Sequence, residues 1–381
     1  MCSGNFYYLC SNKNYNMEQA AKHNLKTIIT ALLALITIGA SAQIKVEVSE
    51  TVELMGILSR TAGFEEFSND LAGQYSKDTE AWFSKYREHP TVAYYQNLRA
   101  KQGIGYERVT NMAIHLDIEK GKVKFIGDLA ELKNNGWQNV DLDGFLKHLN
   151  KFYADTRFHD FFEQHKSFYD AFLKEYDSNV MGYIHPEWYS RFYNGTEQTE
   201  QFRLIIGFTY GTNNNGASRQ LPNRPREVFA VCGYNKNPLT GQLLFDTSLP
   251  LHEFNHAYVN PLLDKVENAK AMQEVGQKLF QLSKSAMEQQ HYNDWHIVIN
   301  ESLVRAAVIV YFHEHGINQF AKNMLTIEMG NGFPWMRDVV TALIYYDAHR
   351  DQYPTISSFY PEIARCLSKY LDKETERMSK P

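Results

Sequence analysis

Cysteine is scarce in this chain, and positive charge is not in excess. The first fact bears on the disulfide content of the fold, and the second on the class of partner. Only four cysteines occur in 381 residues, so the fold does not depend on a disulfide framework. Lysine and arginine number 39 against 44 aspartates and glutamates, which gives a net charge of −5. Basic clusters, runs of like charge, internal repeats and low-complexity segments are all absent from the sequence. The charge balance gives no indication of a nucleic-acid partner or of an acidic membrane surface.

Apolar residues are plentiful. The chain is 44% hydrophobic and 14% aromatic, which is enough to pack the core of one large domain or of two modest ones.

The longest apolar run of the sequence lies near the N-terminus. Lys22 and Lys26 precede an apolar run at residues 27–39, and the small residues 40–42 (Ala-Ser-Ala) follow it. This order predicts a secretory signal peptide that is cleaved after Ala42, with translation starting at Met17. We therefore expect residues 1–42 to be an extra N-terminus plus signal peptide, and the mature chain to be a bacterial periplasmic or secreted protein. Because no cysteine follows the run, we expect no lipid anchor and no stable membrane attachment.

Two cysteines, Cys232 and Cys366, remain in the predicted mature chain. In an oxidising compartment they could pair, or they could be two buried thiols, and the sequence leaves both alternatives open.

The hydrophobic periodicity predicts an α+β fold that is mostly helical. We expect residues 43–195 to form a mainly helical region, and residues 196–381 to form a small mixed sheet followed by helices, the two together making one compact unit. The expected strands are residues 43–48, a strand after Gly121, 202–211, 226–234 and 243–247, the last two as a hairpin, with a polar loop at 213–225. The expected helices are residues 52–60, 65–100 with a break at Pro90, 142–176, 267–290, 295–315, and two or three more after Pro334 and Pro354. A Phe/Tyr stripe at helical spacing within 161–176 is expected to be a core face.

The segment HEFNH at residues 252–256 carries the clearest chemical signal. In a helix, His252 and His256 lie on one face one turn apart, so that both can bind the same metal ion. Glu253 follows the first histidine, where its carboxylate can reach a water on that ion. Ser248 is expected to cap the helix, and the dipeptide at 260–261 (Asn-Pro) to end or kink it.

A catalytic zinc ion needs a third protein ligand, and Glu301 is our candidate. It lies in a segment that is apolar almost all round, where a carboxylate is costly to bury unless it is paired or bound to a metal. The alternative is an intrahelical ion pair between Glu301 and Arg305 at i+4. Glu274 is the rival ligand, although its neighbours are typical of a solvated helix face. Arg305 could also bind a substrate carboxylate or anchor a second carboxylate.

HEFNH followed by Asn300-Glu301 on a later helix resembles the gluzincin metallopeptidases, the thermolysin-like class. The resemblance implies a zincin-like fold in which an edge strand lies beside the active-site helix and holds extended peptide. It also implies one Zn²⁺ per chain with His252, His256 and Glu301 as ligands, and Glu253 as the general base.

The sequence departs from the gluzincin pattern in two ways. The 44 residues between His256 and Glu301 exceed the usual spacing in thermolysin, and Arg305 stands where thermolysin has an aspartate. The whole mature chain also resembles a secreted bacterial family catalogued only as a domain of unknown function, which implies no activity.

The gluzincin resemblance further implies a histidine or tyrosine that stabilises the oxyanion. Tyr346 and His349 are our candidates for that role, with Tyr311 and Tyr345 as further choices. His313 and His315 are expected to cap the end of a buried helix.

The function these patterns favour is an exported zinc-dependent metallopeptidase that hydrolyses peptide bonds with a Glu-assisted, zinc-bound water. The alternative is a non-catalytic periplasmic protein that binds peptide or glycan, with a structural or absent metal. The 24 tyrosines and 23 phenylalanines, which could line such a groove, motivate that alternative. In a third interpretation the motif is accidental, and the two histidines belong to the core.

Overall fold

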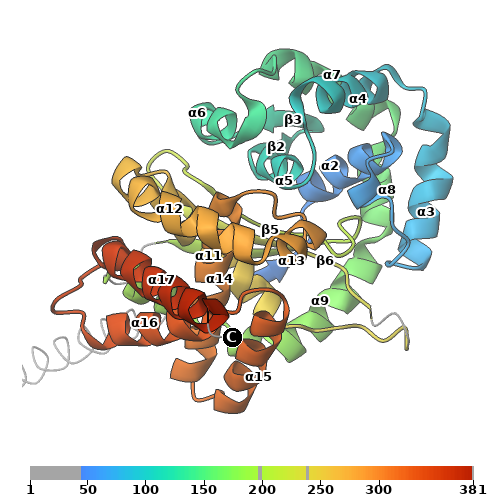
Figure 1. Ribbon diagram of the computed structural model, residues 1–381. Coiled ribbons are helices and arrows are strands. Elements are labelled where there is room, and N and C mark those ends of the chain that lie inside the picture. Colours follow the sequence, from blue (N-terminus) through green and yellow to red (C-terminus); the bar gives the residue numbers. More distant parts are fainter. Residues whose placement is uncertain (1–43, 196–199, 237–239, 380–381) are drawn as a thin grey trace, which may run out of the picture. The chain divides into compact units, whose positions relative to one another are not determined.

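The computed structural model describes residues 44–195, 200–236 and 240–379. The predicted start at Met17, the signal peptide and the cleavage after Ala42 lie outside these residues. Within the described part, residues from Ile44 onward form one compact unit that is α+β and mostly helical (Figure 1). The predicted fold class is confirmed at that level.

The first half of the unit is built mainly of helices, as expected. Its helical segments are α2 (Glu50–Thr61), η1 (Glu65–Phe67), α3 (Gln74–Phe83), η2 (Ser84–Tyr86), α4 (Pro90–Gln102), α5 (Glu107–Ile114), α6 (Leu129–Leu132), η3 (Lys133–Trp137), α7 (Leu142–Asp155), α8 (Phe158–Gln164), α9 (Lys166–Val180), η4 (Met181–Tyr183), α10 (Glu187–Tyr189) and η5 (Ser190–Asn194). A two-stranded antiparallel hairpin, β2 (Leu116–Glu119) with β3 (Lys122–Phe125), interrupts them after α5. The strand predicted after Gly121 is β3.

The long helix predicted over 142–176 is divided into α7, α8 and α9. The chain turns at Arg157, whose φ of 52° is left-handed, and again at His165. Phe161, Phe172 and Tyr176 are buried, so the aromatic stripe is a core face as predicted.

A four-stranded mixed sheet follows, in the order β1-β4-β6-β5. Its strands are β1 (Lys45–Glu47), β4 (Gln201–Gly207), β5 (Asn214–Arg219) and β6 (Glu227–Gly233). The pairs β1–β4 and β4–β6 are parallel, whereas β5 runs antiparallel to β6. β6 has a strand on each side and is buried over nearly its whole length, which explains its continuous apolar sequence.

Two strand predictions in this region were wrong. The polar stretch expected as a loop contains β5, and the expected strand at 243–247 is absent among the described residues, where only an isolated bridge joins Lys236 and Leu243. β5 lacks apolar alternation because it is an edge strand: its backbone pairs with β6, and of its six residues only Ala217 and Arg219 are buried.

The second half of the unit ends in a series of helices. They are α11 (Ser248–Leu263), α12 (Val266–Leu282), α13 (Lys284–Gln289), α14 (Trp295–Glu314), α15 (Asn318–Gly330), α16 (Met336–Ala348) and α17 (Ile356–Ser379). The helix predicted over 267–290 is thus divided between α12 and α13. α11 packs against β5, β6 and α14.

α14 is the one described helix that is long and apolar enough, by length and composition, to cross a membrane. It is instead a core helix of this unit, because 72% of its most apolar window is buried. Glu301 is one of the buried residues of this core helix.

The predicted cap of the HEFNH helix is wrong, and of the two outcomes predicted at Asn260-Pro261, an end or a kink, the end is wrong. Ser248 is the first helical residue rather than the cap, and its backbone N–H (2.8 Å) and hydroxyl (2.6 Å) are donated to Asp246. The helix also continues through Pro261 to Leu263. Proline removes the hydrogen bond to the carbonyl of Ala257, and the guanidinium of Arg226 donates to that oxygen instead (3.1 Å).

Cys232 is buried on β6, and Cys366 is half-buried on α17. Both are free thiols in this structure, so they do not form the disulfide that was one of the two alternatives.

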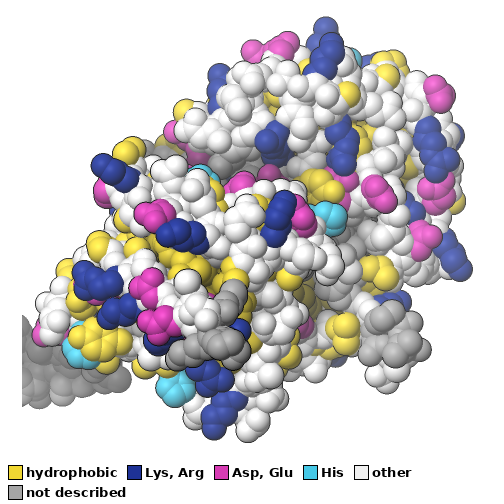
Figure 2. Space-filling view, in the orientation of Figure 1, with side chains coloured by type: hydrophobic (Ala, Val, Ile, Leu, Met, Phe, Trp, Pro, Cys, Tyr) yellow, Lys and Arg dark blue, Asp and Glu magenta, His cyan; other side chains and the backbone are white. Residues whose placement is uncertain are grey.

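The surface drawn in Figure 2 mixes acidic and basic side chains, and neither sign forms a continuous patch on it. This agrees with the absence of a basic cluster from the sequence.

Candidate metal centre

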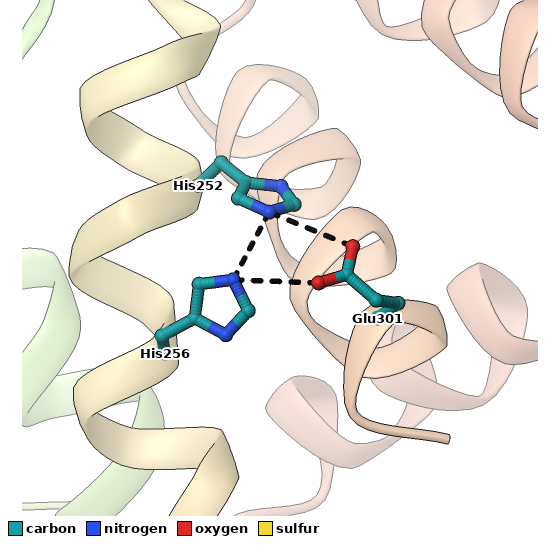
Figure 3. Close-up of side chains that lie close together, drawn as sticks. All are labelled: His252, His256 and Glu301. Atoms are coloured by element: carbon teal, nitrogen blue, oxygen red, sulfur yellow. Dashed lines mark hydrogen bonds and ion pairs between the residues drawn. The ribbon is translucent and has the colours of Figure 1, made fainter. Parts of the chain in front are cut away.

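Helix α11 turns His252 and His256 toward the same point. The two Nε2 atoms lie 3.1 Å apart, as expected for residues one turn apart on a helix face (Figure 3). The Nδ1 atom of His256 lies 3.1 Å from Oδ1 of Asn260, one turn further on. A proton on Nδ1 is donated to that oxygen, which orients the ring. The lone pair of Nε2 is then free to bind a metal ion.

Glu301 on α14 completes a triangle with the two histidines. Its Oε2 lies 3.6 Å from Nε2 of His252, and its Oε1 lies 3.5 Å from Nε2 of His256. The three side chains form a group that could hold a metal ion. A tetrahedral Zn²⁺ with bonds of about 2.05 Å holds its ligand atoms roughly 3.3 Å apart. The donor set and its spacing therefore fit zinc.

The charge states of these residues suit metal binding. Burial lowers the pKa of His252 to about 3, so the imidazole is neutral and its lone pair is available. Burial opposes the ionisation of Glu301, but the two histidines and Arg305 outweigh it and lower its pKa to about 2. Glu301 is thus a carboxylate at any ordinary pH.

Arg305 holds Glu301 in place from the same helix. Its Nε donates to Oε2 of Glu301 (3.0 Å), Nη1 donates to Glu328 on α15 (2.6 Å), and Nη2 donates to the hydroxyl of Tyr292 (2.9 Å). The ion pair that was the alternative interpretation of Glu301 therefore coexists with its position beside the histidines. All three nitrogens of Arg305 are engaged by protein groups. Of the two further roles expected for Arg305, the structure shows the anchoring of a second carboxylate, Glu328.

Tyr292 lies in the segment between α13 and α14. Its hydroxyl is 3.1 Å from Oε2 of Glu301, and burial raises its pKa. The residue is partly exposed and lines the same cleft as the triad. Sequence analysis missed it, because nothing in a lone tyrosine before a helix indicates that the chain brings it back to Glu301.

Glu253 is buried next to the triad. Burial raises its pKa to about 7, and the backbone N–H of Gly216 on β5 donates a hydrogen bond to it. β5 approaches α11 so closely that a Cβ atom at Gly216 would lie 2.0 Å from the backbone oxygen of Glu253. The edge strand and the helix are therefore in direct contact at Glu253.

The other candidates lie elsewhere. Glu274 is exposed and pairs with Lys278 (2.7 Å). The buried hydroxyl of Tyr346 donates to the carbonyl of Phe192 (2.6 Å), and Nδ1 of His349 lies 2.8 Å from the carbonyl oxygen of Tyr345. Neither of these last two lines the cleft around the triad, so the structure does not bring them to the histidines.

His313, His315 and Tyr311 lie at the C-terminal end of α14. His315 is its C-cap residue, with Nδ1 2.7 Å from the carbonyl oxygen of Tyr311, and Nδ1 of His313 lies 2.7 Å from Oδ1 of Asn318. The hydroxyl of Tyr311 donates to the carbonyl of Tyr183 (2.7 Å). His315 therefore caps the helix as predicted.

A cleft of about 1610 Å³ contains the whole group, and His252, His256, Glu253 and Glu301 all line it. Its walls come from β5, α11, α14 and α15, together with residues of α5. The metal-facing atoms are thus open to a ligand from the cleft while the helices that carry them are packed in the interior.

Comparison with known proteins assigns the chain to a family whose description names no function. The family described as "Domain of unknown function (DUF4932)" matches residues 44–366. The chain belongs to this family. This agrees with the resemblance to a family of unknown function. No curated protein matches the chain. No solved structure matches it either.

Proposed function

We propose that this DUF4932 protein is an exported zinc-dependent metallopeptidase of gluzincin type. The observation that carries the proposal is the convergence of His252, His256 and Glu301 at zinc-ligand spacing on the wall of an open cleft. The three come from two helices, and the carboxylate is anchored by Arg305. A half-buried histidine pair kept only for packing would not need a buried carboxylate facing both rings. The predicted signal peptide supports export.

In this proposal a bound Zn²⁺ supplies a Lewis acid, which polarises a carbonyl oxygen and makes water more acidic. Glu253 takes a proton from the attacking water and delivers it to the leaving amine. Its buried position beside the triad supports that role. Tyr292 accepts from Arg305 and donates to Glu301 in this structure. In the proposal it takes the part that the sequence suggested for Tyr346 or His349 by turning that proton from Glu301 to the carbonyl oxygen under attack.

The edge strand supports a peptide as the substrate. Because the N–H of Gly216 turns toward Glu253, the backbone groups of Asn214 and Ser218, two residues away on either side, face the same free edge. An extended peptide can add to this edge as a further strand, as peptides do on other exposed sheet edges. Such a peptide would pass directly beside Glu253 and the triad.

The test combines metal content with hydrolysis. The protein is purified without chelator or histidine tag, its zinc is measured by elemental mass spectrometry, and a mixture of fluorogenic peptides is offered. We expect about one zinc per chain and peptide cleavage, with zinc kept but cleavage reduced at least ~1000-fold in Glu253→Gln. Glu274→Gln, which changes an exposed glutamate outside the cleft, serves as the matched control.

Two results would contradict the proposal. Cleavage by Glu253→Gln at the rate of the unaltered protein would remove the mechanism. Absence of metal after zinc has been offered would remove the enzyme and favour a non-catalytic binding protein.

A further inference from the structure

The cleft is a long groove rather than a compact pocket. One stripe of α11 lines it from end to end, turn by turn: Ser248, His252, His256, Asn260 and then Asp264 just beyond the helix. A helix of 16 residues is ~24 Å long at ~1.5 Å per residue. An extended polypeptide of about seven residues covers that length at ~3.4 Å per residue.

Acidic side chains dominate the charged lining of this groove. The lining carboxylates are those of Glu107, Asp246, Glu253, Asp264, Glu301 and Glu328. Among the described residues, the only basic side chains of lysine or arginine type that line it are Arg226 and Arg305.

The two arginines do not balance these acids. Arg305 is used by Glu301 and Glu328, and Arg226 donates to the carbonyl of Ala257 inside the wall. The charge left to face a ligand comes from three exposed carboxylates, those of Glu107, Asp246 and Asp264. In the described part of the chain none of the three has an ion-pair partner within 4.0 Å.

Two of these acids mark the ends of the groove. Asp246 lies just before α11 and Asp264 just after it, with the metal triad near the middle of the helix. Each acid is eight to ten residues from position 254, or roughly 12–15 Å along the axis, which is about four residues of extended chain. The lining of the groove also includes exposed apolar side chains, among them Leu244 (47%) and Ile327 (58%).

We infer that the groove binds an extended, positively charged polypeptide segment of about nine residues, with basic side chains at its two ends beside Asp246 and Asp264 and about seven uncharged residues between them across the triad. The inference rests on the proposed function for its claim that such a segment is the substrate. The edge of β5 holds the backbone, and the acids at the ends select the charge.

The test uses two blocked nine-residue peptides with the same uncharged core of seven, one ending in lysine on both sides and its twin in glutamate. Their binding to the metal-free protein is measured by fluorescence anisotropy, so that no cleavage interferes. We expect the lysine peptide to bind about tenfold more tightly at low salt, and the ratio to fall toward twofold at about 0.5 M salt, where charges are screened.

Variants locate the effect. Asp246→Asn combined with Asp264→Asn should bring the ratio close to one, and asparagine still accepts the hydrogen bonds that Asp246 receives from Ser248. Glu376→Gln on α17, an exposed acid outside the groove, should leave the ratio unchanged. Equal affinity for the twin peptides, or a double variant that keeps the full preference, would overturn the inference.

Cleavage by the zinc-loaded protein separates the two proposals. If the lysine peptide is preferred in binding but neither peptide is cut, the charge preference stands and the peptidase fails. If both peptides are cut equally and bound equally, the peptidase stands and the charge preference fails.

Discussion

Glu53 on α2 is a carboxyl group with no exposed surface, and it is far along the chain from the candidate metal ligands. It accepts hydrogen bonds from the hydroxyl of Tyr75 (2.5 Å) and the backbone N–H of Phe208 (2.7 Å), and the Tyr75 hydroxyl in turn accepts one from Tyr169 (3.2 Å). Burial raises the pKa of Glu53 to about 7 despite these bonds. The group ties α2 and α3 to the end of β4, and it should make stability depend on pH.

We expect the protein to lose stability as the pH rises from about 4.5 to about 7 through this one group. The unfolded chain releases the proton of Glu53 near pH 4.5, whereas the folded chain keeps it until about pH 7. A difference of that size is worth up to about 3 kcal/mol in the free energy of unfolding. Urea unfolding of the protein and of Glu53→Gln, from pH 5 to pH 8, measures it.

The difference between the two proteins isolates Glu53 from other titrating groups. Glutamine does not ionise, so its stability relative to glutamate should improve steadily up to pH 7 and then stay constant. A difference that is independent of pH would show that Glu53 has an ordinary pKa in the folded protein.

The contact between β5 and α11 illustrates what the sequence could and could not predict about the elements. The helix was predictable because apolar residues surround HEFNH, and Glu301 was predictable because a carboxylate in an apolar helix needs a partner. β5 was not, since its polar residues carry no period of two and its place depends on β6. Likewise, the extension of α11 past Pro261 depends on Arg226, a residue from the sheet that fills the missing hydrogen bond.

Gly216 makes this contact possible by having no side chain. In Gly216→Ala the new Cβ would lie 2.0 Å from the backbone oxygen of Glu253 and 2.9 Å from Cβ of His256, so β5 and α11 must separate. We expect a loss of about 1–3 kcal/mol in stability, as for other overpacked sites. Zinc affinity should fall as well, because His256 moves. Thermal unfolding and zinc titration measure the two effects.

Gly182→Ala is the matched control, since a Cβ there meets nothing within 4 Å. It should behave as the unaltered protein in both measurements. Normal stability and zinc affinity in Gly216→Ala would mean that the helix and strand are not held at this distance.

The elements around the proposed metal position are packed against both halves of the unit. α11 and α14 come from different stretches of chain, and both pack in the interior of the C-terminal half. β5 is also held by the N-terminal half, since Asn213 donates to the carbonyl of Glu66 (2.6 Å) and Glu131 accepts from the N–H of Gln220 (3.1 Å). An ion bound between α11 and α14 should therefore stabilise the whole unit rather than one loop.

Zinc should raise the unfolding temperature of the entire unit. At a free concentration of 100 times its Kd, a ligand that binds only the folded state adds about 2.7 kcal/mol. In a chain of this size that corresponds to a rise of roughly 4 °C, seen by calorimetry as the shift of a single transition. A chelator should reverse it. Glu301→Gln keeps an acceptor for Arg305 and Tyr292 but weakens the metal site, so the shift should largely vanish there while Glu274→Gln keeps it in full. Equal shifts in all three proteins would place the zinc elsewhere, and the convergence of the two histidines on Glu301 would then need another explanation.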